Sequence, residues 1–135
     1  MSGTLYTLGY LYSDATTTLM AMMASDLTTL LVDIRYSPRS RWSPQWSKMQ
    51  LQATWGDRYQ HVKALENMNY HLADAPIQLL DPETGIRWAV ERLLAGYSLM
   101  LLCACKEYER CQRKMVEEQL MQAFESHPST NDLIM

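Results

Sequence analysis

The sequence predicts a single α/β domain with a mostly parallel sheet of four or five strands flanked by helices. Short apolar runs, typical of strands buried on both faces, alternate along the chain with helical segments. The length of 135 residues is that of one domain. The composition, 47% hydrophobic and 20% charged residues, is that of a globular protein and excludes disordered, collagen-like and coiled-coil chains.

The N-terminal part of the chain begins with a predicted strand, a helix and a second strand. Residues 4–8 alternate and carry β-forming side chains before Gly9, which predicts the first strand. Asp14 is a good N-cap residue, and apolar residues at helical spacing follow it to about Ala24. Residues 29–34 are apolar without alternation, the pattern of a strand buried on both faces of a parallel sheet.

The middle of the chain continues with a loop, a helix and a weak strand. Residues 35–43 are rich in Ser and Arg and predict a loop. Ser43 followed by Pro44 forms an N-cap with proline at the first helical position, so we expect a helix to about Thr54. Residues 59–62 contain β-formers and predict a short strand.

The C-terminal part predicts a helix, a strand and a final helix. Asp81 and Pro82 begin a helix whose apolar residues repeat at intervals of three and four, and Gly96 is a suitable residue to end it. Residues 98–104 form a second fully apolar strand. A charged helix follows from about residue 108 to 124. This alternation favours parallel strands joined by right-handed crossovers.

We expect residues 1–126 to form the domain and residues 127–135 to be a frayed tail. No uncharged apolar run approaches the roughly 18 residues of a membrane span, so no membrane contact is expected. The N-terminus lacks the basic region of a signal peptide. Three cysteines, an odd number, are too few for a secreted disulfide framework, so we expect reduced thiols and a cytoplasmic protein.

The net charge of −3 hides a strong asymmetry. The segment from Arg35 to Lys63 holds six basic residues and one acid, a net charge of +5, whereas the rest holds six bases and 14 acids, a net charge of −8. The basic segment also contains three of the four tryptophans. Basic residues interleaved with aromatic ones suit a polyanion, since charges bind phosphates and rings stack on bases. The alternative is a loop with buried rings and solvated charges.

Unusual residues follow each predicted strand. Tyr10 follows the first, Asp33 and Arg35 end the second, His61 lies in the third and Cys103 ends the last. Ligands of open α/β sheets bind outside the carboxyl ends of the strands, so we expect the site there. Tyr10 would donate its hydroxyl to a ligand or close the crevice. His61 would act either as a general base or as a packed structural residue.

Three motifs in order resemble a known family. They are a Thr-Leu-Gly-Tyr opening within residues 6–10, an Asp-Ile-Arg strand end with a Pro-Arg-Ser loop within residues 31–41, and Cys103 on a late strand followed by residues 111–113. Over roughly residues 5–120 this pattern is similar to the family called domain of unknown function 488 (DUF488). The resemblance implies an α/β fold and a shared site more than a particular reaction.

Two positions depart from the family's pattern. Gln112 stands where the family usually has a histidine, and Cys105 stands where glutamate is common. Tyr59 and His61 match a tyrosine that often precedes a histidine or an aliphatic residue by two positions. If the missing histidine is an acid, a base or a metal ligand, this chain is a degenerate or specialised member.

Arginines are the leading candidates for a ligand-binding role. A guanidinium holds phosphate or carboxylate through two parallel hydrogen bonds, and the start of the last helix adds backbone N–H donors. Trp42 would stack on a base. The alternative for Arg35 is a structural salt bridge, for example with Asp33, which must be paired if it is buried. The four candidates for one anion are Arg35, Arg39, Arg41 and Arg113.

Cys103 and Cys111 are the candidate nucleophiles. A helix N-terminus and neighbouring arginines lower a thiol pKa, which favours Cys111, whereas Cys103 is equally well a small buried apolar residue. The eight-residue spacing also permits a disulfide between them. The three cysteines do not have the spacing of a zinc site, so we expect no metal. No Walker, dinucleotide-binding, zincin or GxSxG motif is present, and no cofactor is expected.

These observations lead to three hypotheses. The first is a domain that binds a phosphate-bearing ligand, either a nucleotide or a nucleic acid, at the carboxyl edge of its sheet. The second is an enzyme with a cysteine thiolate that attacks an anionic substrate held by arginines. The third is a protein-interaction module that uses the loop from Trp42 to Trp46. The sequence does not decide whether the protein is an enzyme.

Overall fold

A computed structural model describes residues 3–9, 14–36, 44–69, 72, 75–103 and 111–126. Its centre is a four-stranded sheet in the order β1-β4-β2-β3, and every neighbouring pair of strands is parallel. The predicted fold class is therefore confirmed. The strands are β1 (Leu5–Gly9), β2 (Thr29–Asp33), β3 (Tyr59–His61) and β4 (Ser98–Cys103).

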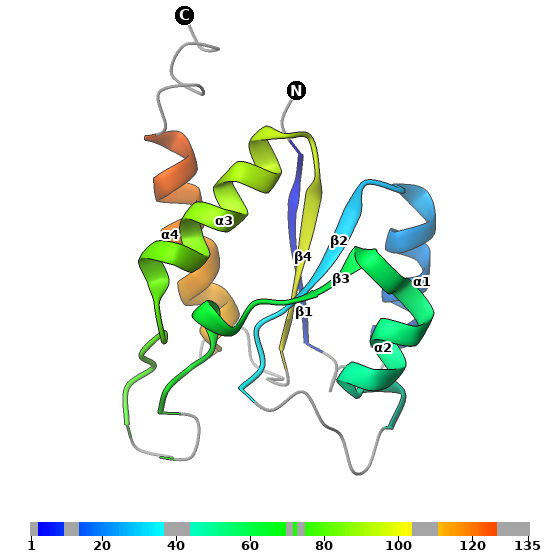
Figure 1. Cartoon of the computed structure of the whole chain (residues 1–135), viewed down its shortest axis with the longest axis horizontal. Helices are drawn as coiled ribbons and strands as arrows, with labels where there is room; N and C mark the ends of the chain where they lie inside the picture. The colour runs from blue at the N-terminus through cyan, green and yellow to red at the C-terminus, as the bar shows by residue number, and fades with distance from the viewer. Residues whose placement is uncertain are drawn as a thin grey trace, which may run out of the picture.

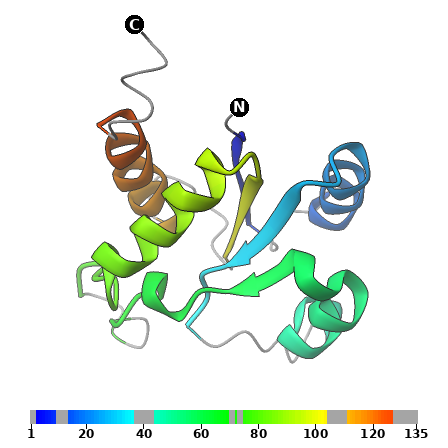
Figure 2. The same cartoon turned by 45° about the horizontal axis from the view of Figure 1, so that its top comes forward.

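Helices cover both faces of the sheet. In Figures 1 and 2, α1 and α2 lie on one face, and α3 and α4 lie on the other. The helices are α1 (Ala15–Ser25), α2 (Lys48–Trp55), α3 (Pro82–Leu94) and α4 (Gln112–Glu125). Three short 3-10 turns accompany them, η1 (Pro44–Trp46), η2 (Gly56–Arg58) and η3 (Lys63–Leu65).

The central strands β2 and β4 are buried along their whole length. Because side chains alternate along a strand, they supply two separate cores. Leu31 and Met100 pack with α1 and α2, whereas Val32 and Leu101 pack with α3 and α4. This two-sided burial explains why the two strands are continuous apolar runs in the sequence.

Local capping signals place two of the helices, one as expected and one not. The Asp81 side chain accepts a hydrogen bond from the Thr84 backbone N–H, with Pro82 in the first turn, as predicted. The predicted helix from Pro44 is wrong in its start. Residues 44–46 form η1 instead, and α2 begins at Lys48, since Ser47 accepts from the Gln50 backbone N–H and acts as the N-cap.

The end of α3 is as predicted, whereas the start of α4 is not. Gly96, with φ of 101°, follows the end of α3 in the conformation that glycine adopts most readily. The last helix, expected from about residue 108, is wrong in its start: α4 starts at Gln112, because Cys111 has an extended backbone conformation and is its N-cap. The expected tail, residues 127–135, lies outside the described residues. No helix in the described ranges combines the length and apolar character needed to cross a bilayer.

Candidate functional site

The carboxyl ends of the four strands meet at one edge of the sheet, which we call the carboxyl edge. Gly9 pairs with Cys103 in the register of β1 and β4, and Asp33 pairs with His61 in that of β2 and β3. The predicted strand-end residues in the described part of the chain are therefore neighbours along this edge. The other candidates lie outside the described residues, namely Tyr10, Arg39, Arg41 and Trp42.

Asp33 is the centre of a buried hydrogen-bond network. The Arg35 Nε and Nη2 groups donate to its two carboxylate oxygens at 2.8 and 2.7 Å, and the Tyr59 hydroxyl donates to Oδ2 at 2.5 Å. All three side chains are at most 5% exposed. The alternative prediction for Arg35, a structural salt bridge with Asp33, is what the structure shows. Burial, and secondly the charge of Asp33, raise the pKa of the Tyr59 phenol, which keeps it a hydrogen-bond donor.

His61 extends this network to a second buried acid. Its Nε2 lies 2.8 Å from Glu66 Oε2 and 3.1 Å from the Arg35 carbonyl oxygen. Because both neighbours are acceptors, Nε2 carries the proton. Glu66 is 4% exposed, and its burial raises the pKa of the carboxyl group against the opposing effects of His61 and Lys63. We call Asp33, Arg35, Tyr59, His61 and Glu66 the polar network.

The start of α4 is fastened to the carboxyl edge by Gln112. Its Nε2 donates to the Ile34 carbonyl at 2.7 Å and to the Leu65 carbonyl at 2.9 Å. These bonds join α4 to the residue that follows β2 and to the last residue of η3. Both amide hydrogens are used in these bonds, and the side chain is buried. Gln112, at the position where the family usually has histidine, therefore serves as a structural hydrogen-bond donor rather than as an acid, a base or a metal ligand.

The two candidate nucleophiles are both in the core on the α3 and α4 side of the sheet. Cys103 is 1% exposed and is not part of a disulfide, whereas Cys111 is disulfide-bonded and 2% exposed, so the two are not joined to each other. The expectation of reduced thiols is therefore wrong for Cys111. The Arg113 Nε donates to Cys111 Sγ at 3.3 Å, and its backbone N–H does so at 3.4 Å. A disulfide sulfur is not a thiolate, so Cys111 would have to be reduced before it could attack a substrate.

The structure thus separates the candidates into two groups. Asp33, Arg35 and His61 belong to the polar network, whose Tyr59 packs in the core beneath α1 and α2. Cys103 and Cys111 pack on the other face, with Arg113 beside Cys111. The contact from Gln112 to Ile34 joins the two groups at the carboxyl edge.

The polar network borders a pocket of about 280 Å³. Tyr59 and His61 contribute to its wall from β3, and Lys48 contributes a positive charge from the start of α2. His61 is recognisable as a candidate because it lies in a predicted strand, whereas no strand or helix pattern in the sequence points to Glu66. The lining residues are Lys48, Gln52, Gly56, Asp57, Tyr59, Gln60 and His61.

Two further expectations concern metal binding and the tryptophan loop. Within the described ranges, no three His, Cys, Asp or Glu side chains are grouped so that they could hold a metal ion. Trp46 is 4% exposed and packs in the core with Leu51 and Met23. Its ring therefore stabilises the fold and is not available to stack on a base or to dock a partner.

Comparison with known proteins gives one result. The family model described as Domain of unknown function DUF488 matches residues 15–120. The match includes the motifs in residues 31–41 and 101–113, and the Thr-Leu-Gly-Tyr opening precedes it. Searches of the curated proteins and of the solved structures gave no match. Because the match spans well over half of the chain, this protein belongs to the DUF488 family.

Proposed function

We propose that the chain binds a phosphate-bearing ligand, a nucleotide or a nucleic acid, at the carboxyl edge of its sheet. The observation that carries the proposal is the position of Arg113. This side chain is 6% exposed and lies in the first turn of α4, next to the residue that bonds to the end of β2. A guanidinium at the start of a helix, beside the carboxyl ends of parallel strands, is well placed to hold a phosphate through two parallel hydrogen bonds.

Three contributions to an anion site would combine here. The amino terminus of α4 carries a partial positive charge, and Arg113 adds a full charge with a planar set of donors. Arg35 contributes less, because its Nε and Nη2 are bound to Asp33 and the pair is neutral. Arg39 and Arg41 follow β2 in the sequence and would approach the ligand from the adjacent loop.

The other two hypotheses have less support. A thiolate mechanism needs an accessible thiol of lowered pKa, whereas Cys103 is buried and Cys111 is disulfide-bonded. An interaction module built on the tryptophan loop loses one of its two rings, since Trp46 is a core residue. Phosphate binding needs neither feature and therefore remains the best-supported function.

Calorimetric titration with inorganic pyrophosphate at low salt tests the proposal. We expect saturable binding to the unmodified chain and an affinity lower by about tenfold or more in Arg113→Lys, since lysine keeps the charge but loses the bidentate fork. Arg87→Lys is the matched control, because Arg87 is exposed on α3 and pairs only with Glu83 among the described ion pairs. This control should bind like the unmodified chain.

Circular dichroism of each variant shows whether the fold is retained. If Arg113→Lys does not fold, Arg39→Ala replaces it as the diagnostic variant, since it removes a charge without changing a described core residue. Two results would overturn the proposal. One is the absence of saturable pyrophosphate binding by the unmodified chain, and the other is unchanged affinity in a folded Arg113→Lys variant.

A further inference from the structure

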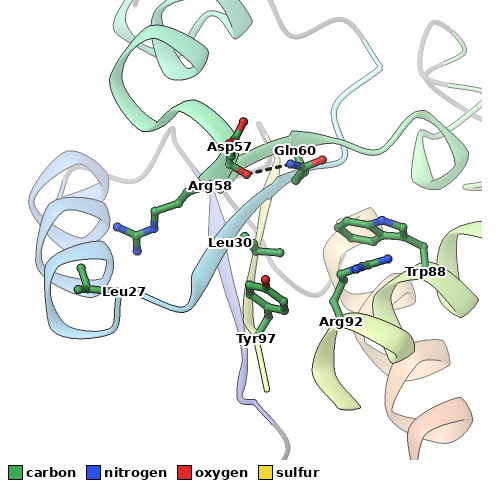
Figure 3. Close-up of a pocket in the computed structure, with 8 residues that line it drawn as sticks. All are labelled: Leu27, Leu30, Asp57, Arg58, Gln60, Trp88, Arg92 and Tyr97. Atoms are coloured by element: carbon green, nitrogen blue, oxygen red, sulfur yellow. Dashed lines mark hydrogen bonds between the residues drawn. The ribbon is translucent and has the colours of Figure 1, made fainter. Parts of the chain in front are cut away.

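A second pocket, of about 360 Å³, lies at the opposite end of the sheet from the carboxyl edge. Leu30 near the start of β2 contributes to it, and Tyr97 comes directly before β4. Figure 3 shows Trp88 and Arg92 of α3 on one side and Gln60 of β3 above them. The residues of the proposed phosphate site take no part in it, so it is a separate site.

Arg92 is the polar centre of this pocket. Its guanidinium stacks over the Trp88 ring, with Cζ 5.6 Å from the ring centroid. Its Nε is buried and has no hydrogen-bond partner among the described residues. The carboxylate paired with it, that of Glu91, is 4.0 Å from Nη2 and more than half exposed, so solvent screens the pair. The Arg92 side chain as a whole is 38% exposed, so its charged end can meet an acceptor that a ligand brings into the pocket.

Arg58, the second arginine of the pocket, uses its guanidinium to bind backbone carbonyls of the fold. The Nε of Arg58 donates to the Thr29 carbonyl, and its Nη2 donates to the carbonyls of Met23 and Asp26. In Figure 3 this side chain extends away from Trp88 and Arg92. Arg92 is therefore the cation that would bind a ligand, and the acidic lining residue, Asp57, lies on the far side of the pocket from it.

The remaining walls suit a flat apolar group. The Trp88 indole, the Tyr97 ring, which is 39% exposed, and the side chain of Leu30 offer apolar surface around the guanidinium. The volume is at the lower end of the roughly 300–1,000 Å³ range of small-molecule pockets, which limits the ligand to about one ring system. The edge of a guanidinium matches a carboxylate through two parallel hydrogen bonds. We propose that this pocket binds a small aromatic carboxylate, held by Arg92 and stacked against Trp88 and Tyr97.

Titration with indole-3-acetate, followed by the indole N–H signals of ¹⁵N-labelled protein, tests this proposal. The chain has four tryptophans, and Trp88→Phe identifies the Trp88 signal. We expect a saturable shift of that signal and an unmoved signal from Trp46, which lies in the core on the other face of the sheet. Indole-3-ethanol, the neutral analogue, should bind about tenfold more weakly, because it offers no charge to Arg92.

Variants separate the role of the charge from simple apolar binding. Arg92→Gln should bind the acid about tenfold more weakly and lose the preference for acid over alcohol, whereas Arg87→Gln on the exposed face of α3 should keep both. Equal affinity of the unmodified chain for acid and alcohol would overturn the proposal without any variant, as would the lack of a saturable Trp88 shift. The probe contains no phosphate, so these results leave the carboxyl-edge proposal to its own test.

Discussion

Buried polar residues at the carboxyl edge form a connected network in which local contacts, such as that of Asp33 with Arg35, combine with contacts between residues far apart in sequence. Tyr59 and Asp33 are 26 residues apart, and Gln112 reaches carbonyls 47 and 78 residues away. Asp33 was recognisable in the sequence as a buried acid that needs a partner, because it follows an apolar run. The sequence leaves two roles open for Arg35, a salt bridge with Asp33 and the binding of an anion.

The pH dependence of stability tests the environment of Glu66. Burial raises the pKa of this carboxyl group in the folded state above its ordinary value near 4.5, while His61 and Lys63 oppose the shift and Asp33 adds to it. The folded state then holds the proton more tightly than the unfolded state. The contribution of Glu66 is complete below pH 4.5 and is lost as the pH rises through the folded pKa.

We therefore expect Glu66→Gln to remove this loss. We would measure urea unfolding at a series of pH values from 4 to 7. The free energy of unfolding of the variant, minus that of the unmodified chain, should increase as the pH rises. The slope difference is at most about 1.4 kcal/mol per pH unit for one proton. Glu83→Gln, an exposed residue of α3, is the control and should leave the slope unchanged. Parallel curves for Glu66→Gln and the unmodified chain would contradict the assignment.

Among the secondary-structure elements, α3 shows how packing overrides local preference. Gly85 lies in its first turns and is buried against η3. A Cβ at this position would lie 2.5 Å from Leu65 Cδ2 and 2.7 Å from Leu65 Cγ. Leu65 is itself fully buried, so its side chain has little room to move.

Gly85→Ala should therefore destabilise the protein although alanine is the better helix former. Overpacking costs about 1–3 kcal/mol and the gain in helix propensity is about 1 kcal/mol, so we expect a net loss of up to about 2 kcal/mol. Guanidinium unfolding measures the difference. Thr84→Ala, at the neighbouring exposed position, should change stability by less than about 0.7 kcal/mol in the favourable direction. A more stable Gly85→Ala variant would show that α3 can move away from η3.

The sequence was most informative where an element depends on its own residues. The start of α3 follows from Asp81 and Pro82, and β2 and β4 follow from their apolar runs. The sequence is misleading at the start of α2, since Ser43 and Ser47 are both good N-cap residues and the structure uses the second. The sequence does not reveal the pocket around Arg92, because Trp88 and Arg92 flank the apolar stripe of α3 and come near Tyr97 only in the folded chain.

Some of the basic residues that create the charge asymmetry of the whole molecule have partners inside the folded domain. Within the basic segment, Arg35 is paired with Asp33, and Arg58 binds three backbone carbonyls. Lys48 and Lys63 are exposed at separate elements. The sequence counts all these charges equally, because it does not reveal which cations find partners inside the domain. If this segment binds a polyanion as proposed, its candidate contacts are the exposed lysines together with Arg39 and Arg41, which follow β2 in the sequence.

The salt dependence of single-stranded DNA binding tests this whole-molecule expectation. Each phosphate contact contributes about 0.7 to the slope of log affinity against log salt, so replacing Arg39 and Arg41 together by alanine should flatten the slope by roughly 1–2. Fluorescence anisotropy of a labelled oligonucleotide at several salt concentrations measures it. Arg87→Ala removes an exposed charge from α3, outside the basic segment, and should leave the slope unchanged. If the double variant keeps the original slope, these arginines do not contact phosphate, and the carboxyl edge would accept at most a nucleotide-sized ligand through Arg113.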